Sequence, residues 1–199
     1  MGCWRDRWQD QQMPFVIVQL ANYDGRQQTG FPRPITPQDA PMNSGWAQLR
    51  EAQRTVAKAD ARAELAVIND LGETVDIHPL RKKEVAERIS LCFDRLIYNN
   101  KVKLSPEVVS AEVKDTQIIL TLDQPIQEGP IYTFEVAGTD GKFANATATA
   151  DGNRITILTP HSSLPTPRTI RYAWKDNPLQ ANARSLSGLP MSSFEITIK

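Results

Sequence analysis

The hydrophobic period of this chain changes at about residue 103. Before that point, short apolar runs alternate with stretches of helical spacing, and after it short segments follow one another with turn residues between them. Strands that alternate with helices favour a parallel α/β layer. Closely spaced short strands favour a β-sandwich. The sequence therefore predicts α/β followed by β, with an α/β part over residues 1–103 and a β-sandwich over residues 104–199.

Two apolar runs in the first part predict buried strands, at residues 15–21 and 65–68. Ser44 is placed to cap a helix that begins near Gly45. Its predicted apolar stripe contains Trp46, Leu49, Gln53 and Val56. A second helix is predicted over residues 80–98, with Val85, Ile89, Cys92 and Leu96 on one face.

Seven strands are predicted in the second part. Pro, Gly, Asp and Asn mark the turns between them, and the Asp-Gly pairs favour tight hairpins. The predicted strands cover residues 108–113, 117–122, 131–136, 144–150, 154–158, 169–174 and 193–198.

The amino terminus carries Trp4 and Trp8 on one face of a helical turn. Such a face is expected to be buried. It predicts either the end of a longer helix or a short helix docked on the core. The segment lacks the apolar stretch of a signal peptide.

Composition narrows the classes of partner. The chain has 23 Lys and Arg against 23 Asp and Glu, so its formal net charge is zero and no basic face stands out. Nucleic-acid binding needs clustered cations and is not expected. No apolar run reaches the ~18–20 residues of a membrane span. Cys3 and Cys92 are too few for a structural zinc site, and no metal or other cofactor is predicted.

Only two histidines are available for acid–base chemistry, and His161 lies in a predicted loop of the β part. His78 follows the second predicted strand, and the carboxyl ends of parallel strands are where catalytic groups gather. Asp76 could orient His78 as a general base. Alternatively, this segment is a polar loop in which Asp76 serves as a turn residue.

A serine nucleophile is not evident, because no Gly-x-Ser-x-Gly elbow occurs. The loop from Asn22 to Asn43 is about 22 residues long and rich in Gly and Pro. Loops of this length are uncommon within compact domains and are often functional. This loop is therefore the candidate for substrate binding.

A series of short motifs runs along the whole chain in order. They are Trp4-Arg5-x-x-Trp8, Pro14-Phe15-x-x-Val18-Gln19-Leu20-Ala21-Asn22-Tyr23, Trp46-Ala47-x-Leu49-Arg50-Glu51-Ala52-Gln53, Asp76-Ile77-His78-Pro79, Lys83-x-x-Val85-Ala86-x-Arg88, Phe134-x-x-Ala137-Gly138, Arg171-Tyr172-Ala173-Trp174 and Gly188-Leu189-Pro190-x-Ser192-x-Phe194. In this ordered set the chain resembles the carboxyl-terminal part of sialate O-acetylesterase-type proteins of the SGNH hydrolase superfamily.

The resemblance implies a flavodoxin-like α/β hydrolase domain with β-sandwich modules, which removes O-acetyl groups from sugars, typically sialic acids. It implies a Ser-His-Asp mechanism in which the serine and the oxyanion donors lie in an earlier region, a missing N-terminal half. His78 corresponds to the catalytic histidine. The family's aspartate stands three residues earlier, where this chain has Val75, so Asp76 or Asp70 would take its role. Family members are commonly periplasmic or secreted.

Two other functions remain open. The β part could be a non-catalytic scaffold or a sugar-binding module. In the first case its aromatic residues form the core, and in the second they form an exposed row. Alternatively, the chain could complement a separately encoded half through an exposed sheet edge. The aromatic residues in question are Tyr132, Tyr172, Trp174 and Phe194.

Overall fold

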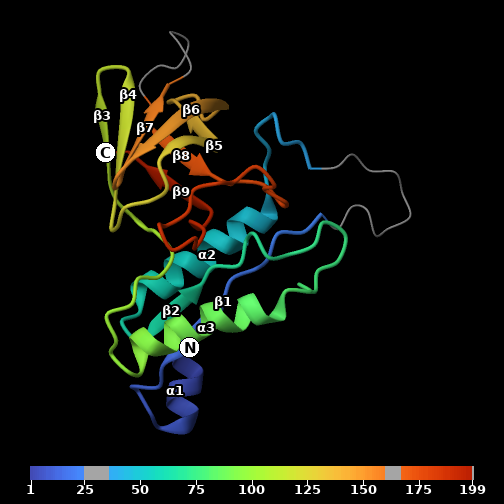
Figure 1. Cartoon of the computed structure of the whole chain (residues 1–199), viewed down its shortest axis with the longest axis vertical. Coiled ribbons are helices and arrows are strands. Elements are labelled where there is room, and N and C mark those ends of the chain that lie inside the picture. The colour runs from blue at the N-terminus through green and yellow to red at the C-terminus, as the bar shows by residue number, and fades with distance from the viewer. Residues whose placement is uncertain (25–35, 160–166, 199) are drawn as a thin grey trace.

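The computed structural model describes residues 1–24, 36–159 and 167–198. In Figure 1 a β-sheet occupies one end of the molecule, an α/β layer lies beside it, and a short helix projects at the other end. The α/β layer holds two parallel strands, β1 (Phe15–Val18) and β2 (Ala63–Ala66), between the helices α2 (Gly45–Ala59) and α3 (Lys82–Leu96). Within the described ranges, no helix has both the length and the apolar character needed to cross a bilayer.

The predicted order of elements in the first part is confirmed, with β1 shorter than predicted and β2 of the predicted length but shifted. β1 ends three residues earlier than predicted, and β2 begins two residues earlier. Ser44 caps α2 as predicted, since its hydroxyl accepts a hydrogen bond from the Ala47 amide at 2.9 Å. Two strands are too few to establish a flavodoxin-like strand order.

The predicted apolar stripe of α2 is only partly buried, since Trp46 and Gln53 are half-buried. Leu49 and Val56 are about half exposed, at 49% and 48%. The helix instead buries a face that includes two arginines and two alanines. This face consists of Ala47, Arg50, Arg54 and Ala57. Apolar spacing could not identify it, because the arginines are held by partners from distant parts of the chain.

All seven strands predicted after residue 104 are present. They are β3 (Val108–Lys114), β4 (Gln117–Leu122), β5 (Gly129–Ala137), β6 (Phe143–Asp151), β7 (Arg154–Leu158), β8 (Thr169–Tyr172) and β9 (Phe194–Thr197). However, they form one antiparallel sheet in the order β3-β4-β7-β6-β5-β8-β9. The structure thus shows a single curled sheet where a sandwich of two sheets was predicted.

The curl originates in the two long central strands. The pairing of β5 with β6 is irregular between Ile131 and Phe134, and Thr133 within this bulge has a left-handed φ of 68°. A bulge bends a strand and increases its twist. One end of β6 pairs with β7, and the other end of β5 pairs with β8. The two halves therefore face each other and enclose one hydrophobic core.

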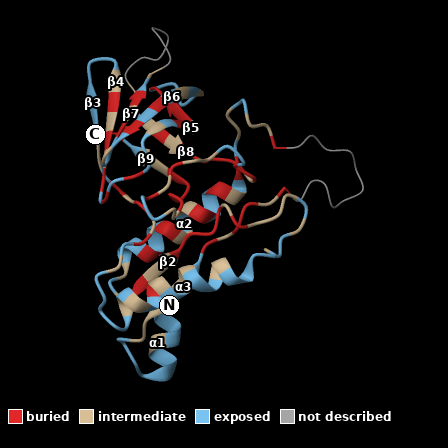
Figure 2. Cartoon of the chain, viewed as in Figure 1, coloured by how far each residue is buried: buried red, intermediate tan, exposed pale blue. Residues whose placement is uncertain are grey.

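Of the four aromatic residues considered for a sugar-stacking row, Tyr172 and Phe194 belong to this core. Tyr172, Trp174 and Phe194 are 1%, 3% and 2% exposed, whereas Tyr132 is 55% exposed. Phe134 and Tyr172 pack with their ring centroids 5.0 Å apart. Figure 2 shows buried residues concentrated in the sheet and on the side of α2 toward it.

Helix α1 (Gly2–Trp8) is a short helix docked by a charged residue. Its Trp face was predicted to be buried, but it is exposed. Trp4 and Trp8 are 59% and 66% exposed. Arg5 pairs with Asp60 at 2.6 Å, and its guanidinium lies over the ring of Phe15.

Candidate active site

The loop between β2 and α3 carries His78 and Asp76 as a solvent-facing pair. His78 Nδ1 lies 3.1 Å from Asp76 Oδ1, and the same oxygen accepts the backbone N–H of His78 at 2.9 Å. The side chains are 81% and 49% exposed. The hydrogen bonds from the His78 backbone and ring hold the pKa of Asp76 below its usual value. A carboxylate in this position fixes the imidazole orientation, as a general base requires.

Asp70, the alternative acid, is part of an ion-pair cluster. Its two oxygens lie 2.5 Å from Arg88 Nη1 and 2.7 Å from Arg184 Nη1. Burial opposes ionisation of Asp70, but the hydrogen bonds and charges of both arginines outweigh it and lower its pKa. Arg81 also donates to the Asp70 carbonyl oxygen. Asp70 thus anchors the base of the His78 loop, and the carboxylate in contact with His78 is that of Asp76.

The His78 loop packs tightly against the segment that follows β1. The Gly72 amide donates to Asn22 Oδ1 at 2.7 Å, and the Asp24 amide donates to the Thr74 carbonyl at 2.8 Å. A Cβ on Gly72 would lie 2.0 Å from the Asn22 carbonyl oxygen, so only glycine fits. The carboxyl ends of the two parallel strands therefore meet at one edge, where α/β ligand sites form.

The candidate substrate loop is described at its two ends only, residues 22–24 and 36–43. These ends are joined, because Asp24 Oδ2 accepts hydrogen bonds from the Thr36 amide at 2.5 Å and from its hydroxyl at 2.7 Å. The rest of the loop lies outside the described residues, as does His161.

The buried serines in the described part of the chain have structural partners. Ser44 donates to Asp176, and Ser185 is paired with Ser187. Ser192 and Ser193 each donate to a backbone carbonyl. None of these contacts places a serine hydroxyl against His78.

Arg50 joins α2 to the curled sheet, and this contact was not predictable from sequence patterns. It is fully buried. Its guanidinium donates to Ser193 Oγ at 3.0 Å and to the carbonyls of Lys175 and Asp176 at 2.8 and 2.6 Å. Burial lowers the pKa of Arg50 to about 10, against the opposing charge of Asp176. The segment after β8 is thereby fixed over the α/β layer.

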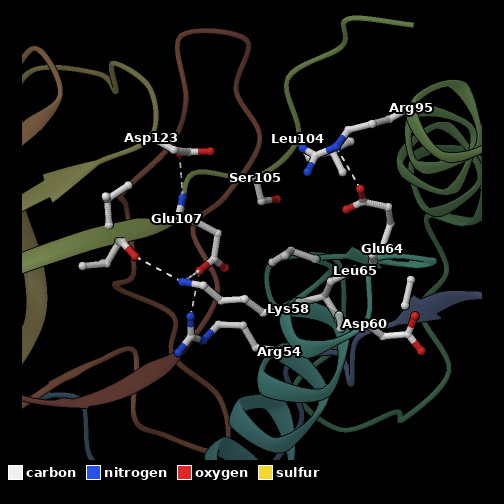
Figure 3. A pocket seen from close by; sticks show the side chains of 16 residues that line it. Arg54, Lys58, Asp60, Glu64, Leu65, Arg95, Leu104, Ser105, Glu107 and Asp123 are labelled. Carbon is white, nitrogen blue, oxygen red and sulfur yellow. Dashed lines mark hydrogen bonds and ion pairs between the residues drawn. The ribbon is translucent and has the colours of Figure 1, made fainter. Parts of the chain in front are cut away.

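A separate hollow of about 520 Å³ lies where α2, β2 and the start of β3 meet (Figure 3). Several of its charged groups form ion pairs across the hollow. Arg54 lies 2.7 Å from Glu107, and Arg95 lies 2.8 Å from Glu64. The hollow does not include His78 or Asp76. We therefore assign it to the junction between the α/β layer and the sheet.

The fold is similar to part of a solved esterase. The chain matches a carbohydrate acetylesterase from Xanthomonas citri with a TM-score of 0.80 and 30% sequence identity. The match covers 98% of this chain and 43% of the esterase, so the chain spans less than half the length of that protein. No family model and no curated protein matches the chain. The similarity shows that nearly the whole chain shares its fold with part of that esterase.

Proposed function

We propose that this chain supplies the histidine and aspartate of a Ser-His-Asp carbohydrate O-acetylesterase. The exposed Asp76–His78 pair in the loop between β2 and α3 carries the proposal. The similarity to a carbohydrate acetylesterase supports it. Sialate-type O-acetylated sugars are the proposed substrates, on the sequence resemblance described above.

His78 is the proposed base and acid in turn. It accepts the proton of a serine hydroxyl as the serine oxygen attacks the acetyl carbonyl, and then gives that proton to the departing sugar oxygen. Water next attacks the acetyl-serine with His78 again as the base. Acetate leaves and the serine recovers its proton. Asp76 orients the imidazole and stabilises its charged form.

The serine and the oxyanion donors are proposed to come from an α/β segment that pairs with β1. Phe15 and Gln19 donate their backbone N–H groups to the carbonyls of Arg62 and Ala66, on the β2 side of the strand. Backbone groups of successive strand residues point to opposite sides, so those of Val16 and Val18 face the other edge of β1. Among the described strands, only β2 pairs with β1. Parallel sheets are normally larger and covered on both faces, so this edge suits a further parallel strand. The same free edge is where a separately encoded subunit would dock to complete the enzyme.

Complementation provides the test. The purified chain is mixed or co-expressed with the part of the Xanthomonas citri esterase that the match leaves uncovered, and acetate release from O-acetylated sialic acid and from an acetylated neutral sugar is measured. We expect the chain alone to be inactive and the complex to be active. His78→Ala should abolish the activity, whereas His161→Ala, the matched control, should retain it.

Two results would contradict the proposal. Hydrolysis by the chain alone would show that the nucleophile lies within it. Equal activity of the His78→Ala complex would remove His78 from the mechanism. Preference for the neutral sugar would refute only the sialate specificity. A complex that forms without activity would favour the scaffold function, which the buried aromatic core of the sheet also supports.

A further inference from the structure

Asn177 occupies a buried position between three segments that border the candidate site. Its Oδ1 accepts a hydrogen bond from Asn22 Nδ2 at 2.8 Å, and its Nδ2 donates to Thr74 Oγ1 at 3.2 Å. Its carbonyl accepts a hydrogen bond from Gln38 Nε2 at 2.9 Å. One residue thus contacts the segment after β1, the His78 loop and the described end of the substrate loop.

The network extends beyond Asn177 itself. Asn22 Oδ1 accepts the Gly72 amide, so Asn177 holds the side chain that in turn holds the His78 loop. Asn177 is 0% exposed, and water therefore cannot replace its partners. Removing a buried hydrogen-bonding group leaves its partners unsatisfied, which is more costly than losing an exposed bond.

The curled sheet delivers Asn177 to this position. Ala173, directly after β8, has a left-handed φ of 50° and turns the chain away from the sheet. Arg50 then fixes the carbonyls of Lys175 and Asp176, and Tyr23 donates its amide to Asp176 at 3.2 Å. The two residues before Asn177 are therefore held in place, and Asn177 is pre-organised toward the loops.

We infer that Asn177 is a positioning residue for the Asp76–His78 pair, so that the curled sheet sets the geometry of the site. The inference rests on the proposed function for the role of His78. The positioning effect does not involve the serine. Asn177 fixes residues 72–74, and these residues in turn hold Asp76 and His78, which follow two and four residues further on.

The test uses the whole chain and needs no activity. Asn177→Leu removes both side-chain hydrogen bonds at similar volume. Thr74→Val removes only one of these hydrogen bonds. This milder variant is the one to measure if Asn177→Leu does not fold. The control is Asn182→Leu, because the Asn182 side chain also makes one hydrogen bond as donor and one as acceptor, but its partners Pro130 and Tyr132 lie in β5.

Two NMR readouts separate positioning from simple stability. Amide exchange of Gly72 and Asp24 should rise at least about tenfold in Asn177→Leu, and by less in Thr74→Val. The His78 ring ¹⁵N resonances should move toward those of Asp76→Asn, in which the ring loses its charged partner. The chain has two histidines, so His161→Gln assigns the spectrum. Asn182→Leu should change neither readout.

Faster exchange without movement of the His78 resonances would reduce Asn177 to a structural role and overturn the inference. Unchanged exchange in Asn177→Leu would overturn it as well. These outcomes are distinct from failure of the proposed function. If His78→Ala leaves the complemented enzyme active, the esterase role of His78 fails while the exchange result stands.

Discussion

Replacing Gly72 by alanine should force apart the two loops that meet at the candidate site. The added Cβ would lie 2.0 Å from the Asn22 carbonyl oxygen and 2.9 Å from Asn22 Oδ1. Real Cβ atoms are almost never found within 3.0 Å of another heavy atom, so the carbonyl must move by at least 1.0 Å, the difference between these two values. The neighbour is backbone, and no side-chain rotation can relieve the contact.

The size of the effect follows from that displacement. A shift of this size stretches the Gly72–Asn22 hydrogen bond from 2.7 Å beyond the upper end of the hydrogen-bonding range, about 3.2 Å. Overpacking costs about 1–3 kcal/mol, and loss of the hydrogen bond about 1 kcal/mol more. The free energy of unfolding should therefore fall by about 2–4 kcal/mol. For a chain of this length the melting temperature should fall by about 4–16 °C.

Thermal unfolding followed by circular dichroism measures the change, and Gly45→Ala is the matched control. Gly45 is the first residue of α2, and nothing lies within 4 Å of an added Cβ there. Alanine in a helix is favoured over glycine by up to about 1 kcal/mol, so this variant should melt at the same or a higher temperature. Equal melting temperatures for Gly72→Ala and the parent chain would refute the close packing of the two loops.

Three further predictions concern buried groups. Arg50→Met should lower the free energy of unfolding by about 3 kcal/mol in urea titrations, because buried carbonyls lose their donors. The pKa of Asp70 is lowered in the folded state, so its contribution is present above its unfolded pKa of about 3.9 and is lost as the pH falls through the folded value. The urea midpoint of Asp70→Asn should therefore change less with pH than that of the parent chain, in titrations below about pH 4. Burial raises the pKa of Cys92 to about 12, and a thiol reagent should modify exposed Cys3 in the native chain but Cys92 only after unfolding.

Local patterns predicted the elements well, because the residues that define a strand or a cap are neighbours in sequence. The bounds of β4 and β7 match the predicted ranges, and Ser44 caps α2. The Asp76–His78 contact was predictable for the same reason, since only two residues separate the partners.

Long-range polar contacts were not predictable from local patterns. Asn22 and Asn177 are 155 residues apart, and Arg50 and Ser193 are 143 residues apart. No periodicity marks an asparagine or arginine that is buried because of a distant partner. The curl of the sheet was hidden for a related reason, as it depends on Thr133 adopting a left-handed conformation that β-branched residues rarely take.

The polar face of α2 changes how the second part of the chain is understood. An appended module would need only an apolar or water-filled contact with the α/β layer. Here a fully buried guanidinium on α2 finds its acceptors in the segment after β8, and Gln19 after β1 donates to Ser192 Oγ at 2.6 Å. Removing one partner of such a buried hydrogen bond leaves the other group unsatisfied, which costs free energy of folding. The curled sheet is therefore part of the structure that holds the His78 loop, and a change in either part should be felt in the other.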